Sequence, residues 1–177
     1  LVDAILNENL QGKTLLELGT GSGAISISIA QENKDCFIFA TDISIKSILV
    51  AKQNAAKFYC ENIIFLNHDW NNEWLFPQVD YLISNPPYVD KEATTGREEG
   101  IWYEPEKALF SKDKGLSDLK LILSKGKNFL NENGKVYLEH APDQYEELNK
   151  FAMENGYLNF SNLNDLNGDK RVSIYQC

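Results

Sequence analysis

Residues 14–23 read Thr-Leu-Leu-Glu-Leu-Gly-Thr-Gly-Ser-Gly, and this stretch decides the fold. Its apolar half, Thr14–Leu18, predicts a buried strand, and three glycines in a G-x-G-x-G spacing follow at once. Glycine allows a tight turn and lets a ligand approach the backbone without a Cβ in the way. The spacing differs from that of dinucleotide folds and phosphate loops, and no lysine follows to meet a phosphate. The stretch therefore predicts a strand, a ligand-binding loop and a helix; a tight turn without a ligand is the alternative.

Short apolar runs alternate with longer helical patterns along the rest of the chain. This alternation is typical of an α/β fold, in which helices cover both faces of a mostly parallel sheet. Seven runs are expected to be strands: Thr14–Leu18, Cys36–Thr41, Ile63–Asn67, Tyr81–Ser84, Lys135–Glu139, Leu158–Leu163 and Val172–Gln176. The Asn167-Gly168 pair between the last two runs predicts a hairpin, so the last strand is expected to be antiparallel to its neighbour.

Three segments carry apolar residues at helical spacing, and each stripe is expected to face the sheet. The stripes are Ile45, Ile48, Leu49, Ala55, Ala56 and Tyr59; Leu116, Leu119, Ile122, Leu123, Phe129 and Leu130; and Tyr145, Leu148, Phe151 and Ala152. In a fourth segment, Ile25, Ile27 and Ile29 alternate with serines and favour a strand by propensity. We expect a helix there as well, because a right-handed crossover between two parallel strands needs one.

The length, charge and cysteine content narrow the class of protein. A chain of 177 residues is expected to form one domain. The 26 acidic and 17 basic side chains leave a net charge of −9, the wrong sign for a protein that holds nucleic-acid phosphates by electrostatics alone. No run reaches the roughly 18 apolar residues of a membrane span. The three cysteines have no C-x-x-C spacing, so we expect no zinc site, no disulfide framework and a cytoplasmic location.

Acidic residues follow the second and third expected strands, at the edge of a parallel sheet where ligands bind. Asp42 ends the second strand, and an acid there can accept hydrogen bonds from both hydroxyls of a ribose. Capping of the helix that begins near Ile43 is the alternative role. Asp69-Trp70 follows the third strand, and such a pair can hold an adenine, although a helix cap and a core tryptophan explain it equally well.

The segment Ser84-Asn85-Pro86-Pro87-Tyr88 follows the fourth strand and is the most informative in the chain. Two prolines fix the backbone and remove two donors, so the segment displays acceptors in a rigid turn. A planar NH2 group can donate to the Asn85 side-chain oxygen and to the Pro86 carbonyl oxygen while Tyr88 lies against its π face. The segment therefore predicts a site for a neutral amide or aryl amine; a proline-terminated strand with an incidental asparagine is the alternative.

Together these motifs resemble the S-adenosylmethionine-dependent methyltransferases of the Rossmann-like class that modify planar NH2 groups. Within that class the chain is similar to the PrmC/HemK family, whose members methylate a glutamine of peptide-chain release factors. The further residues that carry this resemblance are Asp69-Trp70, Tyr103-Glu104-Pro105, Ala108-Leu109, Leu138-Glu139-His140, Gly168-Asp169 and Arg171-Val172, in the order of the family. The chain departs from the family at Ala141, where a glycine is usual, but keeps the glutamine that follows as Gln144.

The resemblance implies a fold, a cofactor and a set of site residues. The implied fold is a seven-stranded sheet, and residues 1–177 are the catalytic domain of a protein whose small helical N-terminal domain is missing from this chain. S-adenosylmethionine is the implied cofactor, and the partner is a release factor with a Gly-Gly-Gln motif; we expect a monomer without metal, nucleic acid or membrane contact. The implied cofactor residues are Glu17, Gly19, Thr20, Gly21, Ser22, Gly23, Asp42, Asp69, Trp70 and Asn85. Substrate is held by Asn85, Pro86, Pro87 and Tyr88, of which Asn85, Pro86 and Tyr88 are catalytic.

Other residues and two rival functions stay open. His68 and His140 are expected to be structural, because no matching cysteine or carboxylate set accompanies them. Glu104 and Glu139 can hold the substrate or carry solvated charge, and Arg171 can pair with Glu139 or Asp169. A DNA or RNA amino-methyltransferase also uses Asn-Pro-Pro-Tyr but usually has a basic surface. A non-catalytic cofactor-binding subunit would keep the fold and lose the site. The long charged stretch from residue 90 to 111 is typical of a lid or a disordered loop.

Overall fold

The computed structural model describes residues 1–90, 110–113 and 115–177. Its elements are, in chain order, α1 (Val2–Leu6), β1 (Thr14–Leu18), α2 (Ala24–Glu32), β2 (Phe37–Asp42), α3 (Ile45–Lys57), β3 (Ile63–Asn67), β4 (Val79–Ser84), β5 (Val89–Asp90), β6 (Phe110–Ser111), α5 (Ser117–Gly126), the 3-10 turn η2 (Lys127–Phe129), β7 (Leu130–Glu139), α6 (Tyr145–Glu154), β8 (Asn159–Asn164) and β9 (Lys170–Gln176). Most of the long charged stretch, including Tyr103-Glu104-Pro105 and Ala108-Leu109, therefore lies outside the described residues.

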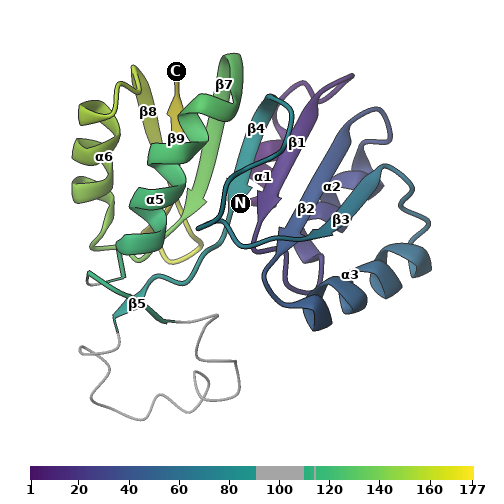
Figure 1. Ribbon diagram of the computed structural model, residues 1–177. Helices are drawn as coiled ribbons and strands as arrows, with labels where there is room; N and C mark the ends of the chain where they lie inside the picture. Colours follow the sequence, from purple (N-terminus) through teal and green to yellow (C-terminus); the bar gives the residue numbers. More distant parts are fainter. Residues whose placement is uncertain (91–109, 114) are drawn as a thin grey trace.

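Seven strands form one sheet in the order β3-β2-β1-β4-β7-β9-β8 (Figure 1). The adjacent strands β3, β2, β1, β4 and β7 pair in parallel, and β9 runs antiparallel to both β7 and β8. The α/β fold, the seven strands and the final hairpin are thus confirmed. Gly168 supplies the positive φ of 91° that the hairpin turn requires. Within the described ranges, none of the helices has the length and apolar character that crossing a membrane requires.

Residues 24–32 form helix α2, as expected in spite of their strand-like alternation. Gly23, just before the helix, adopts a left-handed conformation with φ 85°. The helix is packed on several sides at once: Ser26 binds Glu17, Ile27 packs near α3, and Ile29 packs near α1. These tertiary contacts override a local preference that favours extended backbone.

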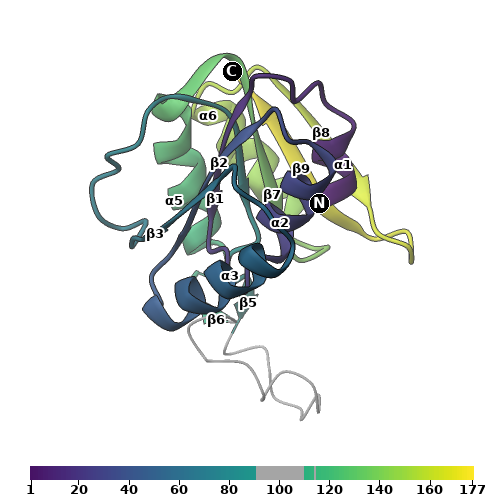
Figure 2. The ribbon, with the colours of Figure 1, turned by 90° about the vertical axis from the view of Figure 1, so that its right-hand side faces the viewer.

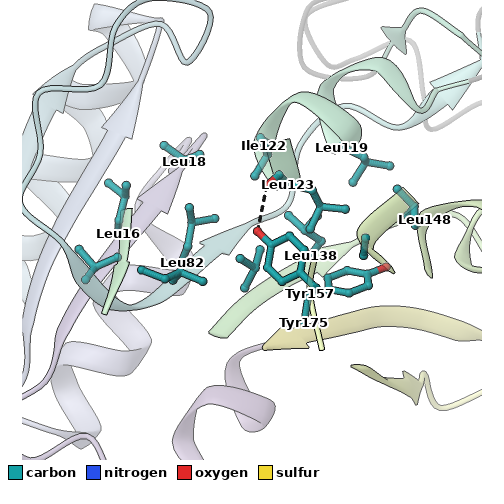
Figure 3. Packing of buried hydrophobic residues seen from close by; sticks show 14 of the residues in the cluster. Leu16, Leu18, Leu82, Leu119, Ile122, Leu123, Leu138, Leu148, Tyr157 and Tyr175 are labelled. Atoms are coloured by element: carbon teal, nitrogen blue, oxygen red, sulfur yellow. Dashed lines mark hydrogen bonds between the residues drawn. The ribbon is translucent and has the colours of Figure 1, made fainter. Parts of the chain in front are cut away.

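Both faces of the sheet are covered by helices, with the core divided between them. Leu16 and Leu138 point to one face and pack with residues of α5 and α6 (Figure 3). Their chain neighbours Leu15 and Tyr137 point to the other face and pack with residues of α1 and α2. Figure 2 shows α5 on one side of the strands and α1 and α2 on the other. This alternation is the period-two pattern of strands that are buried on both faces.

The apolar stripe expected on α3 is only partly confirmed. Ile48 and Ala55 are buried against β2 and β3, but Ile45 and Leu49 are each 55% exposed. Ala56 is exposed too, and Tyr59 lies beyond the end of the helix with a φ of 54°. The reason is position: α3 covers the end of the sheet where β3 is the last strand, so only a narrow stripe of the helix finds a surface to contact.

The helical stripe that begins at Leu116 ends earlier than expected. Helix α5 stops at Gly126, and Phe129 lies in the 3-10 turn. Leu130 belongs to β7, because it pairs with Val79 at the start of β4 and is buried there. The hydroxyl of Tyr157 donates to the carbonyl oxygen of Leu123 at 2.9 Å and fixes the last turn of the helix (Figure 3).

Both histidines take part in packing. His140 is fully buried, with its ring nitrogens 2.8 Å from the Ala141 carbonyl oxygen and 2.7 Å from the Ser173 hydroxyl. Burial lowers the pKa of His140. The ring of His68 meets Phe76 edge-on, with 5.0 Å between the ring centres. The structural roles expected for both histidines stay predictions.

Candidate active site

The loops that follow β1, β2, β3 and β4 lie at one edge of the sheet, where the chain leaves β4 and leads to β5 (Figure 1). The register places Leu18 beside both Thr41 and Ser84, and Asp42 beside Asn67. Because the carboxyl ends of parallel strands share an edge, the side chains that follow each strand come together. The structure therefore brings the glycine loop, Asp42, Asp69-Trp70 and Asn85–Tyr88 to one place.

The glycine loop is tied to the end of β2. Its three glycines, Gly19, Gly21 and Gly23, have positive φ angles of 76°, 55° and 85°. Residues other than glycine rarely adopt this conformation. The backbone amides of Gly19 and Thr20 both donate to the Thr41 carbonyl oxygen, at 2.9 and 2.8 Å. The carbonyl oxygen of Ser22 accepts a 2.9 Å bond from Asn54 of α3. The loop is thus shaped before any ligand binds.

Glu17 lies beneath the glycine loop and is almost fully buried. One of its carboxylate oxygens accepts hydrogen bonds from the Thr20 hydroxyl, at 2.7 Å, and from the Ser26 hydroxyl. The other oxygen, Oε1, is buried without a hydrogen-bond partner among the described residues. Burial raises the pKa of Glu17, and the two hydroxyls oppose this rise only in part. A ligand that brings a donor or a positive charge would satisfy this oxygen.

Asp42 does not cap α3, so that alternative is wrong. The cap is Ser44, whose hydroxyl accepts a bond from the Ser47 amide at 3.2 Å. The carboxylate of Asp42 instead accepts bonds from the backbone amides of Gly21 and Ser44, at 2.9 and 2.8 Å. It therefore lies beside the glycine loop, and each of its oxygens can still accept further hydrogen bonds.

Asp69 starts a turn after β3 and does not begin a helix, which corrects the helix-cap alternative. Its Oδ1 accepts bonds from the backbone amide and the side chain of Asn71, at 2.9 and 2.8 Å. Burial opposes ionisation of Asp69, but these hydrogen bonds and the nearby Lys125 outweigh it and lower its pKa. The carboxylate thus stays charged, with Oδ2 making no hydrogen bond within the described ranges.

Trp70 is half-buried between the glycine loop and α5. A Cβ on Gly19 would lie 3.2 Å from its ring, so the absence of a side chain at Gly19 allows this close packing. The indole N–H donates to Asp118 at 3.1 Å. Lys125 donates to the carbonyl oxygens of Trp70, Asn71 and Asn72, at 2.8, 3.0 and 2.8 Å. Asp118 and Lys125 were not foreseen, because these contacts cross about 50 residues and no local motif marks them.

The first half of the Asn-Pro-Pro-Tyr segment, Asn85-Pro86, has acceptors that no described residue uses. Ser84 fixes the end of β4 through a 2.7 Å bond to the Leu18 carbonyl oxygen. Pro86 and Pro87 are buried, whereas Asn85 is exposed. In the part of the chain that the structure describes, neither the Asn85 side chain nor the carbonyl oxygens of Asn85 and Pro86 have a hydrogen-bond partner. A donor that arrives here would meet free acceptors on a backbone that β4 and two prolines hold still.

Tyr88 is held at both ends by residues from the second half of the chain. Its hydroxyl donates to Glu139 at 3.3 Å and accepts a 3.0 Å bond from Arg171. Its carbonyl oxygen accepts a 2.9 Å bond from the side chain of Gln144. In the described ranges Arg171 therefore makes its hydrogen bond to Tyr88, where the sequence had suggested Glu139 or Asp169.

Comparison with known protein families shows which family this chain belongs to. Residues 1–103 match the methyltransferase small domain. The chain belongs to this methyltransferase family. The matched part contains the glycine loop, Asp42, Asp69-Trp70 and the whole Asn-Pro-Pro-Tyr segment, so it includes all the residues that the resemblance implies for binding cofactor and substrate.

Named relatives of this methyltransferase match over most of the chain. The bifunctional methyltransferase of Rickettsia bellii is 38% identical over 166 residues, which are 93% of this chain and 30% of that protein. The release factor glutamine methyltransferase of Francisella tularensis is 34% identical over 176 residues, which are 99% of this chain and 62% of that protein. The chain therefore spans between 30% and 62% of the length of these two curated relatives.

A solved structure shares the fold of this methyltransferase. The crystal structure of a methyltransferase from Pyrococcus furiosus superposes with a TM-score of 0.71 at 20% identity, and the match covers 98% of this chain and 80% of that one. At this identity the likeness concerns the fold alone. The strand order and the antiparallel β9 are those of a class I S-adenosylmethionine-dependent methyltransferase, as expected.

Proposed function

We propose that this protein transfers a methyl group from S-adenosylmethionine to the side-chain amide nitrogen of the glutamine in a release-factor Gly-Gly-Gln motif. The observation that carries the proposal is the exposed Asn85, whose side chain has no hydrogen-bond partner in the described ranges and follows β4 at the same edge as the glycine loop. The relative from Francisella tularensis, named for glutamine methylation of a release factor, supports it over nearly the whole chain.

The residues at this edge fit S-adenosylmethionine. The buried Oε1 of Glu17 has no partner in the described residues, and a ligand with a cationic methionine end would satisfy it. In our proposal, Glu17 and Gly19–Gly23 hold the methionine end, Asp42 accepts from the ribose hydroxyls, and Asp69 with Trp70 borders the adenine. When bound, the cofactor supplies an electrophilic methyl group on a sulfonium.

The protein's own contribution is to hold the amide. An amide nitrogen is a poor nucleophile, because its lone pair is delocalised into the carbonyl, so its position and direction limit the rate. The Asn85 side-chain oxygen and the Pro86 carbonyl oxygen would each accept one N–H of the glutamine amide. These bonds fix the nitrogen and strengthen as positive charge grows on it. One N–C bond would form as the bond between the methyl carbon and the sulfonium sulfur breaks, and the sulfur would keep that electron pair and leave as a neutral thioether. The nitrogen would then release one proton to water, so no basic side chain is needed.

Transfer of a labelled methyl group tests the proposal. The full-length protein is incubated with methyl-labelled S-adenosylmethionine and, in separate reactions, a release factor, the same factor with the Gly-Gly-Gln glutamine changed to glutamate, duplex DNA and RNA. We expect label only in the unmodified release factor. Label in DNA or RNA would assign the site to an exocyclic base amine, which Asn-Pro-Pro-Tyr also fits. Label in none of the four would favour a non-catalytic subunit.

Alanine substitutions at two glycines of the loop, Gly23 and Gly21, are expected to lower stability by different amounts. In Gly23→Ala the new Cβ would lie 2.8 Å from Ile27 Cδ1 and 3.1 Å from Ala51 Cβ at a φ of 85°, so the free energy of unfolding should fall by about 1–3 kcal/mol. In Gly21→Ala, at φ 55°, nothing lies within 4 Å of the new Cβ, and the loss should be about 1 kcal/mol.

Cofactor affinity should separate the two variants further. The methyl group added in Gly21→Ala projects into open space beside the loop, where the methionine end of the cofactor is proposed to bind. We therefore expect affinity for S-adenosylmethionine to fall by about tenfold. Urea unfolding measures the stabilities, and titration calorimetry measures the affinities. Equal destabilisation of the two proteins would show that the close approach of the added Cβ at position 23 to Ile27 and Ala51 has no effect on stability.

A further inference from the structure

The hydroxyl of Tyr88 is used in both of its hydrogen-bonding capacities. It donates to the Glu139 carboxylate at 3.3 Å and accepts from the Arg171 guanidinium at 3.0 Å. The guanidinium carbon also lies 5.3 Å from the centre of the tyrosine ring. A hydroxyl with a donor on one side and an acceptor on the other cannot turn freely, so the ring is fixed in direction.

The backbone of Tyr88 is fixed separately. Its carbonyl oxygen accepts a 2.9 Å bond from the side-chain NH2 group of Gln144, and the side-chain oxygen of Gln144 accepts a 2.9 Å bond from the Ala141 amide. Gly115 lies against the same carbonyl so closely that a Cβ there would overlap it. The bond from Gln144 and the packing of Gly115 therefore hold the backbone end of the residue in place.

The two charged partners are placed by the sheet. Glu139 ends β7, where it pairs with Val172 of β9, and the amide of His140 donates to the Arg171 carbonyl oxygen at 2.9 Å. The antiparallel pairing of β7 and β9 thus brings the carboxylate of Glu139 and the guanidinium of Arg171 to the edge of the sheet where β4 ends. Burial and Glu139 raise the pKa of Tyr88, while Arg171 opposes them, so the hydroxyl stays protonated.

We propose that Glu139 and Arg171 are positioning residues for amide methylation: they hold the Tyr88 ring as a fixed wall of the proposed amide site, whose acceptors are Asn85 and Pro86. Neither residue needs to touch the substrate. Their opposite charges meet at one hydroxyl, which leaves the wall without net charge and suits a neutral amide. This inference rests on the proposed function, and it assigns a role in the chemistry at the end of β4 to β9, the last strand in the chain.

A double-mutant cycle tests it in the full-length protein. Glu139→Gln, Arg171→Met and Tyr88→Phe are each expected to lower kcat for methylation of a release factor by about tenfold, with KM for the factor changed by less than about threefold. Affinity for S-adenosylmethionine, from calorimetry, should stay within about twofold. In a Tyr88→Phe background, Glu139→Gln should lower kcat by less than about twofold, because the bond through which it acts has gone.

Two control variants remove similar charges without touching Tyr88. Lys170→Met removes the cation that precedes Arg171 in the chain, and the ammonium of Lys170 lies 3.7 Å from the centre of the Tyr145 ring. Glu147→Gln removes an exposed acid that pairs with Lys120 at 2.6 Å. Both should retain the wild-type kcat.

The outcomes separate the two claims. A wild-type protein that does not methylate the factor overturns the proposed function and this inference with it. An active wild-type protein overturns the inference alone if Glu139→Gln and Arg171→Met keep full kcat. The same follows if their losses appear only in melting temperature, or if Glu139→Gln is as harmful in the Tyr88→Phe background as it is on its own.

Discussion

Replacing Asn85 with alanine is expected to lower the rate of methyl transfer to a release factor by about 10²–10³-fold. The variant removes one of the two acceptors that would hold the amide, and water in its place would not fix the direction of the nitrogen. Because Asn85 is exposed and makes no hydrogen bond in the described ranges, the fold itself should not be affected. Single-turnover kinetics at saturating cofactor measure the rate, and thermal unfolding checks the fold.

Cofactor affinity decides what Asn85 holds. If its role is confined to the substrate amide, Asn85→Ala should bind S-adenosylmethionine within about threefold of the wild-type protein. A loss of affinity as large as the loss of rate would make Asn85 a cofactor ligand, the other role that the sequence suggests for it. Asn164→Ala is the matched control, because Asn164 is an exposed asparagine on β8, at the far side of the sheet. It should change neither quantity.

The sequence predicted the sheet well because strand and loop signals are local. A strand such as Thr14–Leu18 shows its burial in consecutive apolar residues, and the glycines after it mark the turn. Errors arose where a pattern depends on a distant surface. Leu49 and Ile45 continue a helical stripe, yet the sheet ends at β3 and leaves them exposed. Leu130 continues another stripe, but pairing with Val79 draws it into β7.

The candidate site shows the same division. Motifs identify the residues that follow each strand, such as Asp42 and Asn85, since each is read from its own neighbourhood. The residues that support them cannot be found in this way. Glu139 and Arg171 meet Tyr88 across 51 and 83 residues, and only the order of strands in the sheet makes them neighbours. Periodicity does not determine that order, so the sequence left the roles of both undecided.

Replacing Glu17 with glutamine is expected to weaken binding of S-adenosylmethionine by about 10- to 100-fold, the equivalent of about 1.5–3 kcal/mol for a hydrogen bond to a charged group. Glutamine keeps the size of the side chain, and its oxygen can still accept from Thr20 and Ser26. It loses the negative charge and places an NH2 group where the free carboxylate oxygen lies. Titration calorimetry at pH 8 measures the loss.

The cofactor-free protein should respond in the opposite direction. Folding raises the pKa of Glu17 above its ordinary value of 4.5, so its protonated form favours the folded state. That stabilisation is complete below pH 4.5 and is lost as the pH rises through the folded-state pKa. Glu17→Gln has no such loss. Its free energy of unfolding, relative to wild type, should therefore increase between pH 4.5 and pH 8, and urea unfolding at several pH values measures this.

The comparison with wild type isolates Glu17 from other acids. Glu8, Asp69 and Asp80 have lowered pKa values and stabilise the fold as pH rises, but they are present in both proteins and cancel in the difference. Glu32→Gln, at the exposed end of α2, is the control and should follow wild type throughout. If Glu17→Gln bound the cofactor normally, the carboxylate would serve only to fix the loop through Thr20 and Ser26. A carboxylate that weakens the empty protein and strengthens the loaded one is the behaviour expected of a binding group.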